Sequence, residues 1–247
     1  MSRARARKAM NAAEAGGQAE PLNVRVHRSS DEAASSFTVE RIVPMTVLDV
    51  LLAIQREHDH SIGFRFSCRV AMCGTCTVRV NGRSVLACQR IVEPVERNIA
   101  IAPAAGMPVI RDLIVDTTPF WEQWQRVIPY VSPEDGELDE PAVVAPDSPE
   151  RQAIDPALDC IQCGACYSSC GFAGDDGQFI GPAALNRAYA LISDSRDDAG
   201  QERLDIIAGQ DGVGRCHFMY GCTGVCPKGL DPARAIRAAR TGRLKDR

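Results

Sequence analysis

The first part of the chain alternates apolar and polar positions with the period of two that is typical of β-strands. Residues 22–28 and 36–43 show this pattern, which predicts two strands joined as a hairpin. Residues 47–58 then carry an apolar stripe at helical spacing, and Thr46 stands where an N-cap is expected. Strand, strand and helix in this order are the beginning of a β-grasp fold.

More strands are expected on either side of a tight turn. A long loop over 60–76 leads to strand-like stretches at 77–80 and 83–88, and the Asn81-Gly82 pair between them is a strong signal for a two-residue hairpin turn. A last strand is expected over 99–102. Residues 21–116 are therefore predicted to form one sheet domain.

The pattern changes to helical spacing in the second half. Residues 117–131 place aromatic and aliphatic side chains on one helical face, which predicts packing between the two halves. Residues 132–150 contain four prolines and seven acidic residues without Lys or Arg, so 117–150 is expected to be a connecting helix and a linker. Residues 151–247 are expected to form a helical domain.

Proline marks two helix starts in that helical domain. Pro182 opens a helix that is predicted to run to about Ile192, and Asp231-Pro232 caps and starts another that ends before Gly242. The expected fold class is α+β, with an N-terminal β-grasp domain of the plant-ferredoxin type followed by an all-α domain of the bacterial two-cluster ferredoxin type.

Composition excludes some classes of function. The formal net charge of -4 gives no reason to expect nucleic acid as the main partner. No uninterrupted apolar run is longer than residues 50–54, far short of the roughly 20 residues that span a bilayer. Any attachment to a membrane would therefore have to come from another subunit. Residues 1–20, whose first eight positions include four basic residues and no acid, are expected to be a disordered tail, with a transit peptide as the alternative.

The chain has eleven cysteines, which is a high count for its length of 247 residues. An odd number with repeated two-residue gaps favours metal ligands over disulfides, because thiols at such spacing converge on one centre. This predicts a reducing compartment.

Four cysteines in the first half match the plant-type ferredoxin pattern C-x4-C-x2-C with a fourth Cys further along the chain. They are Cys68, Cys73, Cys76 and Cys88. We expect them to hold a [2Fe-2S] cluster, with Gly74 allowing the main chain to approach it closely. A four-cysteine zinc site is the alternative, since zinc uses the same thiolates.

The second half contains two bacterial ferredoxin runs, and the second of them, over 216–227, has Met219 where a cysteine is expected. In two-cluster ferredoxins the fourth Cys of each run binds the other cluster. The predicted [4Fe-4S] ligands are therefore Cys160, Cys163, Cys166 and Cys226. The second cluster is left with Cys170, Cys216 and Cys222. A thioether is a poor substitute for a thiolate, so Met219 predicts a vacant corner and a [3Fe-4S] cluster.

Three clusters of different type suit electron transfer better than structural support. A single metal site would be enough to stabilise each domain, so three sites of graded type need another explanation. The sequence shows no nucleophile with its base, no phosphate-binding glycine loop and no hydride site. We therefore expect the chain to carry electrons between partners. A purely structural zinc protein is the alternative from another class.

The ordered motifs resemble the iron-sulfur subunits of succinate dehydrogenase and fumarate reductase over about residues 22–240. The segments that carry the resemblance are 66–69, 73–76, 111–116, the Cys160 run, 179–184, 194–197 and 226–228. The resemblance implies a sheet domain docked on a flavoprotein that carries FAD and the dicarboxylate site. It also implies a helical domain seated on one or two membrane anchor subunits that bind quinone.

Electrons would pass between flavin, [2Fe-2S], [4Fe-4S], [3Fe-4S] and quinone, toward either succinate oxidation or fumarate reduction. The expected location is the cytoplasmic face of a bacterial inner membrane, or alternatively the mitochondrial matrix face. A different flavoprotein or a soluble acceptor, which the acidic pair Asp175-Asp176 would suit, is the other interpretation.

The sequence departs from the family where quinone is expected. Gly171 follows Cys170 in place of the usual Pro, and residues 173–176 lack the tryptophan and asparagine found in many members. His217 matches a position near the quinone, and Lys228 follows the last cysteine; a hydrogen bond from His217 to backbone or cluster sulfur is an equal alternative. The C-terminal helix and the residues after it are basic, and this region is expected to be a solvated face; its basic residues are Arg234, Arg237, Arg240, Arg243 and Lys245.

Overall fold

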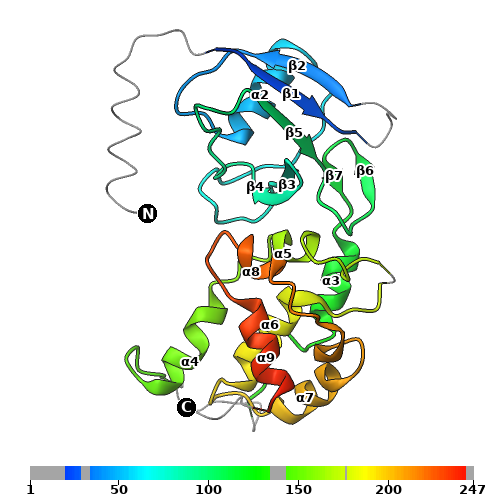
Figure 1. The fold of residues 1–247 in the computed structure, drawn as a ribbon. Coiled ribbons are helices and arrows are strands. Elements are labelled where there is room, and N and C mark those ends of the chain that lie inside the picture. The colour runs from blue at the N-terminus through cyan, green and yellow to red at the C-terminus, as the bar shows by residue number, and fades with distance from the viewer. Residues whose placement is uncertain (1–19, 29–33, 134–142, 176, 243–247) are drawn as a thin grey trace.

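The structure is a computed structural model that describes residues 20–28, 34–133, 143–175 and 177–242. A sheet domain lies above a helical domain in the view of Figure 1, which confirms the expected α+β class. The predicted disordered tail, apart from residue 20, and the centre of the predicted linker, 134–142, lie outside the described residues. So do Asp176 and residues 243–247.

The sheet has five strands in the order β2-β1-β5-β3-β4. β1 pairs with β5 in parallel and the other pairs are antiparallel, as in a β-grasp fold. The expected hairpins β1–β2 and β3–β4 are both present, the second around Asn81-Gly82. The strands are β1 (Leu22–Val26), β2 (Ser35–Val39), β3 (Thr77–Val80), β4 (Arg83–Leu86) and β5 (Asn98–Ala102).

Helix α2 (Val47–Glu57) packs its apolar stripe into the core formed with the sheet. Thr46 caps it as predicted: the Thr46 hydroxyl accepts the Asp49 N–H at 3.2 Å, and the Asp49 carboxylate accepts the Thr46 N–H at 2.9 Å. Leu48, Leu51 and Ile54 are buried, and each contributes roughly 1.5–3 kcal/mol of hydrophobic stabilisation.

A short hairpin and a helix connect the sheet to the helical domain. The hairpin, β6 (Val109–Arg111) and β7 (Ile114–Val115), was not predicted. Helix α3 (Thr118–Gln125) ends earlier than the spacing over 117–131 suggested. Beyond its end, Ile128 adopts a positive φ of 49°, which a helix does not allow. Phe120 is nevertheless buried against Tyr167 of the helical domain, with ring centroids 5.7 Å apart, so the aromatic face does join the two halves.

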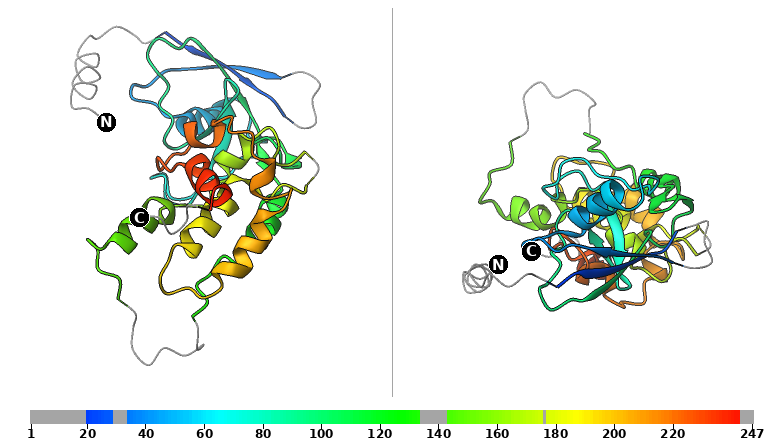
Figure 2. Two further views of the ribbon diagram at one scale, coloured as in Figure 1. Left: turned by 60° about the horizontal axis from the view of Figure 1, so that its bottom comes forward. Right: turned by 90° about the horizontal axis from the view of Figure 1, so that it is seen from above.

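The helical domain is built around α6 (Gly181–Ile192), which is buried along nearly its whole length. Both α6 and α9 (Pro232–Arg240) match the predicted helices, and they pack side by side (Figures 1 and 2). The remaining elements are α4 (Pro149–Leu158), α5 (Ala165–Ser168), α7 (Gly200–Ala208), a 3-10 turn (Val213–Arg215) and α8 (Gly221–Gly224). Helix α4 begins inside the predicted linker. In the described ranges, no helix has the length and apolar character to cross a membrane.

Direct side-chain contacts join the two domains. The Ser84 hydroxyl of β4 donates to the Ser168 hydroxyl of α5 at 2.9 Å, and the Ala105 N–H donates to the same oxygen at 2.8 Å. The core of the helical domain also includes Ala104 and Met107 from the chain that leaves the sheet. The domains therefore share packing and polar contacts at this boundary.

A buried arginine fixes the chain that follows α3. Arg203 of α7 is fully buried and its guanidinium donates to the backbone carbonyls of Val127, Ile128 and Tyr130. The same guanidinium pairs with Asp197, whose side chain is also fully buried. These contacts hold residues 127–130 against the helical domain.

Candidate iron-sulfur centres

The first cysteine set begins in the loop after α2. The Cys68 sulfur accepts the backbone N–H groups of Val70, Met72 and Cys73 at 3.3–3.4 Å. Arg69 and Ala71 within this loop have positive φ values of 60° and 55°. Several backbone amides thus converge on one sulfur, as in the anion-binding nests of other loops.

The other three cysteines of this set lie near one another. Burial, together with the charges of Cys88 and Cys73, raises the pKa of Cys76 to about 12. The pKa of Cys73 is lowered to about 6 by hydrogen bonds from the Cys68 backbone and from Thr75, whose hydroxyl is 3.2 Å from the Cys73 sulfur. The structure thus brings together the four cysteines that the sequence grouped.

The second cysteine set surrounds one apolar cavity. Four cysteines line it, two of them from the loop before α5, one from α5 and one from the chain after α8. They are Cys160, Cys163, Cys166 and Cys226, the same four that were predicted to share a cluster. Burial raises the pKa of Cys163 to about 11 and raises those of Cys160 and Cys166 as well. Iron binding would therefore release protons from these thiols.

The third set lines a neighbouring cavity. Cys170, Cys216 and Cys222 all contribute to its wall, and Met219 lies at its edge. Burial raises the pKa of Cys222, and the charges of Cys170 and Cys216 add to the effect. The Met219 side chain is 81% exposed, so it is directed largely toward solvent.

The three residues expected near quinone do not lie in one place. Gly171 and His217 line the third cavity, where the His217 ring stacks on Phe172 with centroids 4.6 Å apart. Lys228 lines the second cavity instead. The stacked Phe172 was not identified from the sequence, because nothing in the spacing shows that it meets His217.

The donor sets fit iron-sulfur clusters. The two cavities bring cysteine thiols together in sets of four and three, and Fe–S clusters are held by cysteine thiolates. Among the residues that the structure describes, no three His, Cys, Asp or Glu side chains are arranged to hold a single metal ion. Cluster binding differs from this, since the thiolates of one set are shared among several irons.

Comparison with known proteins places both halves of the chain. Residues 22–122 match the family described as a 2Fe-2S iron-sulfur cluster binding domain, and residues 156–230 match the 4Fe-4S dicluster domain. The chain is 39% identical over 228 residues to succinate dehydrogenase (ubiquinone) iron-sulfur subunit 2, mitochondrial, of Oryza sativa subsp. japonica, covering 88% of this chain and 73% of that protein. It is 37% identical over 209 residues to the succinate dehydrogenase iron-sulfur subunit of Coxiella burnetii, covering 84% and 88%.

The chain belongs to the family of succinate dehydrogenase iron-sulfur subunits. The Paracoccus denitrificans member is 37% identical over 209 residues, with 82% of this chain and 77% of that protein covered. The fold is also that of a chain in the Mycobacterium smegmatis Sdh1 complex in the apo form, with a TM-score of 0.80, 24% identity and coverage of 92% and 97%. The chain therefore has a 2Fe-2S domain and a 4Fe-4S dicluster domain, and its function is electron transfer through iron-sulfur clusters.

In this iron-sulfur subunit the first and second cysteine sets meet at the domain boundary. A Cβ added to Gly74 would lie 2.6 Å from the Ile161 carbonyl oxygen and 2.9 Å from the Cα of Cys163. Gly74, which has a φ of +70°, is therefore required by the neighbouring domain's backbone. Its predicted role in admitting a cluster stays a prediction.

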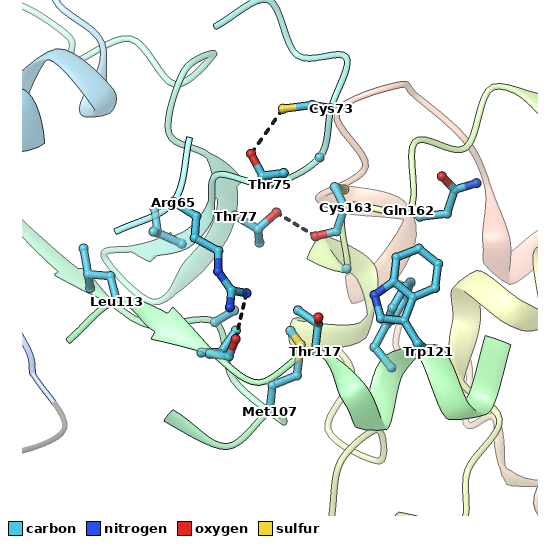
Figure 3. A pocket seen from close by; sticks show the side chains of 16 residues that line it. Arg65, Cys73, Thr75, Thr77, Met107, Leu113, Thr117, Trp121, Gln162 and Cys163 are labelled. Carbon is cyan, nitrogen blue, oxygen red and sulfur yellow. Dashed lines mark hydrogen bonds between the residues drawn. The ribbon is translucent and has the colours of Figure 1, made fainter. Parts of the chain in front are cut away.

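A cavity of about 160 Å³ lies beside this contact (Figure 3). Thr77 of β3 and Cys163 both line it, and the Thr77 hydroxyl donates to the Cys163 carbonyl at 2.7 Å. Arg65 and Trp121 form other parts of its wall. Sequence reasoning missed Thr77, because a strand threonine carries no signal for a partner in another domain.

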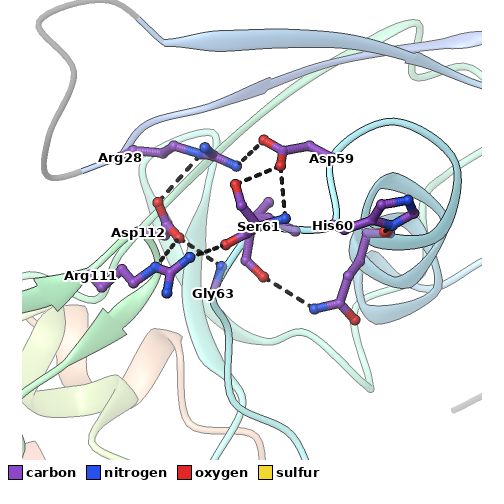
Figure 4. A network of polar contacts seen from close by, with 9 residues as sticks. Arg28, Asp59, His60, Ser61, Gly63, Arg111 and Asp112 are labelled. Carbon is purple, nitrogen blue, oxygen red and sulfur yellow. Dashed lines mark hydrogen bonds and ion pairs between the residues drawn. The ribbon is translucent and has the colours of Figure 1, made fainter.

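A polar network holds the start of the first cysteine loop (Figure 4). Buried Asp112 accepts the Gly63 N–H at 2.7 Å and lies 3.4 Å from Arg28, which also pairs with Asp59 at 2.6 Å. Arg111 donates to the Ser61 carbonyl at 2.5 Å. Arg111 and Asp112, the first two residues of the 111–116 motif, therefore hold the start of the first cysteine loop. They connect it to the chain that follows β1 and to the β6–β7 hairpin.

Arg187 is a second residue that the sequence did not single out. It is half-buried on α6, donates to the Pro129 carbonyl at 3.0 Å, and its charge counteracts the burial that raises the pKa of Cys160. A cation in this position favours negative charge at the second cysteine set.

Proposed function

We propose that this chain is the electron-transfer subunit of a membrane-bound succinate:quinone oxidoreductase. It relays electrons between an FAD-carrying flavoprotein subunit, which also holds the dicarboxylate site, and quinone bound at one or two membrane anchor subunits. The observation that carries the proposal is the continuity of the three cysteine sets. The first meets the second through Gly74, Thr77 and Cys163.

The second set continues directly into the third. Cys166 lies on α5 and Cys170 follows that helix, while the charge of Cys222 reaches Cys166 and raises its pKa. The second and third cysteine sets therefore meet at the short helix α5. The order of the three cysteine sets along the molecule suits an electron relay whose first and third centres face different partner subunits.

Each set has a proposed cluster. The [2Fe-2S] ligands are Cys68, Cys73, Cys76 and Cys88. The [4Fe-4S] ligands are Cys160, Cys163, Cys166 and Cys226. The [3Fe-4S] ligands are Cys170, Cys216 and Cys222. When bound, such clusters supply one-electron redox chemistry over roughly -700 to +450 mV.

The third cavity is the proposed quinone end. Gly171 and His217 belong to its wall, and stacking on Phe172 restrains the His217 ring beside Cys216. A restrained imidazole can donate or accept one hydrogen bond in a fixed direction. Lys228 remains a proposed quinone neighbour on the family resemblance alone.

The proposed location is the cytoplasmic face of a bacterial inner membrane, with the mitochondrial matrix face as the alternative. Relatives of both kinds support it, since one is named as mitochondrial and another is from Coxiella burnetii. The same residues serve a quinol:fumarate reductase that runs in the opposite direction.

Purification of the native complex through this chain tests the proposal. We expect a co-purifying flavoprotein with covalent or tightly bound flavin, hydrophobic anchor subunits, and succinate-dependent reduction of quinone. A complex without flavin whose chromophores do not respond to succinate would contradict it. A complex that contains flavin but no anchor, and that reduces a soluble acceptor, would instead support a relay for a different flavoprotein or acceptor.

A further inference from the structure

The β3–β4 hairpin of the sheet domain contacts three segments that carry cysteines of the helical domain (Figure 1). Thr77 donates to the loop before α5, and Ser84 donates to α5 itself. The guanidinium of Arg83, the first residue of β4, donates to the backbone carbonyl of Gly224, the last residue of α8. Two of the contacts are between neutral groups, whereas the third brings a cation from one domain onto the backbone of the other.

Gly224 lies between two cysteines that belong to different sets. Cys222 on one side lines the third cavity, and Cys226 on the other lines the second. The Gly221 carbonyl, at the start of the same turn, accepts a backbone N–H within the turn, while the Gly224 carbonyl accepts Arg83. Arginine side chains near a helix C-terminus satisfy its last carbonyls in this way. The contact with Arg83 therefore holds the turn that joins the second and third cysteine sets.

Arg83 also supplies a positive charge at this turn. Its side chain is exposed, and within the described residues it forms no ion pair with a carboxylate. A cluster gains one negative charge when it is reduced, so a cation near its ligands favours the reduced state. Because water and salt screen an exposed charge, the effect should be moderate. Arg83 begins β4 whereas Cys88 follows its end, so the charge lies at the end of the strand away from the first cysteine set.

We propose that Arg83 is a positioning residue for the second and third centres: it holds the turn between Cys222 and Cys226 and raises the midpoint potentials of the clusters that these thiolates bind. The inference rests on the ligand sets of the proposed function and extends them. It gives the sheet domain a part in the redox properties of two clusters to which it supplies no ligand. Docking of the two domains then sets the potentials of the centres as well as their separation.

Redox titration of the native complex, followed by EPR, tests this role. We expect Arg83→Gln to lower the midpoint potentials of the [4Fe-4S] and [3Fe-4S] centres. The ratio of reduced to oxidised cluster should change by at most about tenfold, which equals about 59 mV for one electron. The [2Fe-2S] potential should change least, and it serves as the internal reference. Arg83→Lys keeps the charge and should restore most of the lost potential. The matched variant Arg25→Gln, which changes an exposed arginine of β1, should titrate as the parent does.

Visible absorption and iron content verify that each variant carries its clusters. Arg83→Met, a second neutral variant, should shift both potentials in the same direction as Arg83→Gln. Unchanged potentials in the two neutral variants, or a shift of the [2Fe-2S] centre as large as the others, overturn the proposal. So does an Arg83→Lys variant that behaves as the neutral ones do, because the charge would then play no part. A complex that contains zinc in place of iron would instead reject the proposed function, whereas intact clusters with unchanged potentials reject the role of Arg83 alone.

Discussion

Met219 is the residue on which the proposed three-iron centre depends. It occupies the ferredoxin position of a fourth cysteine, and it lies at the edge of the cavity lined by Cys170, Cys216 and Cys222. We predict that Met219→Cys favours a fourth iron there and lowers the midpoint potential, because a thiolate adds negative charge. Loss of the [3Fe-4S] EPR signal measures this.

An added thiol elsewhere controls for nonspecific effects. Val95→Cys places a cysteine at a position that is 84% exposed on the sheet domain, and it should leave the [3Fe-4S] signal intact. An unchanged signal in Met219→Cys as well would count against the ligands proposed for this centre.

Arg187 tests the electrostatics of the second cysteine set. We expect Arg187→Gln to lower the midpoint potential of the [4Fe-4S] centre, because a cation near Cys160 favours the more negative, reduced state. The shift should be about 60 mV or less, which corresponds to a tenfold change in a one-electron equilibrium. Redox titration followed by EPR measures it, with Arg56→Gln on α2 as the control. A potential that rises or stays constant contradicts this role.

Residue types and spacing identify cysteines well but say little about their surroundings. The grouping of Cys160, Cys163 and Cys166 with the distant Cys226 follows from one general rule on ferredoxin runs, and the structure does place them around one cavity. Gly74 shows the limit. Its need for a bare Cα comes from the backbone of residues 161–163, and sequence spacing does not show which segment lies across a domain boundary.

At the scale of elements, β3 meets the loop before α5 through one hydroxyl. We predict that Thr77→Val removes the bond to the Cys163 carbonyl, which contributes about 1 kcal/mol, and loosens the contact between the first two cysteine sets. The magnetic interaction between the [2Fe-2S] and [4Fe-4S] centres, measured by EPR power saturation, should weaken. Thr77→Ser should restore it, and Thr38→Val on β2 should have no effect. Equal spectra for all variants would show that Thr77 does not position the loop.

Helix α7 contributes the buried pair that anchors the chain after α3. Arg203→Met leaves Asp197 buried without its cation, and we expect a loss of about 3–5 kcal/mol of stability. The additional change Asp197→Leu should recover much of this loss, since an apolar pair avoids the desolvation cost. Thermal unfolding measures both effects, and the exposed Arg25→Met should change Tm little. A neutral Arg203→Met variant would contradict a structural role for the pair.

Elements with clear boundary residues were predicted best. Thr46 before α2, Pro182 in α6 and Asp231-Pro232 at the start of α9 each mark a helix start by a local rule, and all three helices are present. Helices α4 and α7 were missed, because α4 contains an internal Pro156 and α7 lacks a side-chain cap. The short β6–β7 hairpin has only exposed side chains on β6, so it shows no alternation for a pattern to detect.

At the scale of the whole molecule, the stacking of the two domains turns three separate motifs into one series. The sequence predicts two ferredoxin-like halves but not that Gly74 and Thr77 of the first half contact the loop of Cys163 in the second. Such contacts depend on how complete domains dock. They are also what an electron relay requires, since transfer between centres depends on short separations.

Low-temperature EPR of the native complex, recorded before and after succinate is added, tests the central claim most directly. We predict a [3Fe-4S] signal in the oxidised complex that succinate removes, and a [2Fe-2S] signal that succinate produces, because both centres would belong to one relay fed by the flavoprotein. A complex that contains zinc without visible iron-sulfur absorption, or iron-sulfur signals that succinate leaves unchanged, would contradict the account.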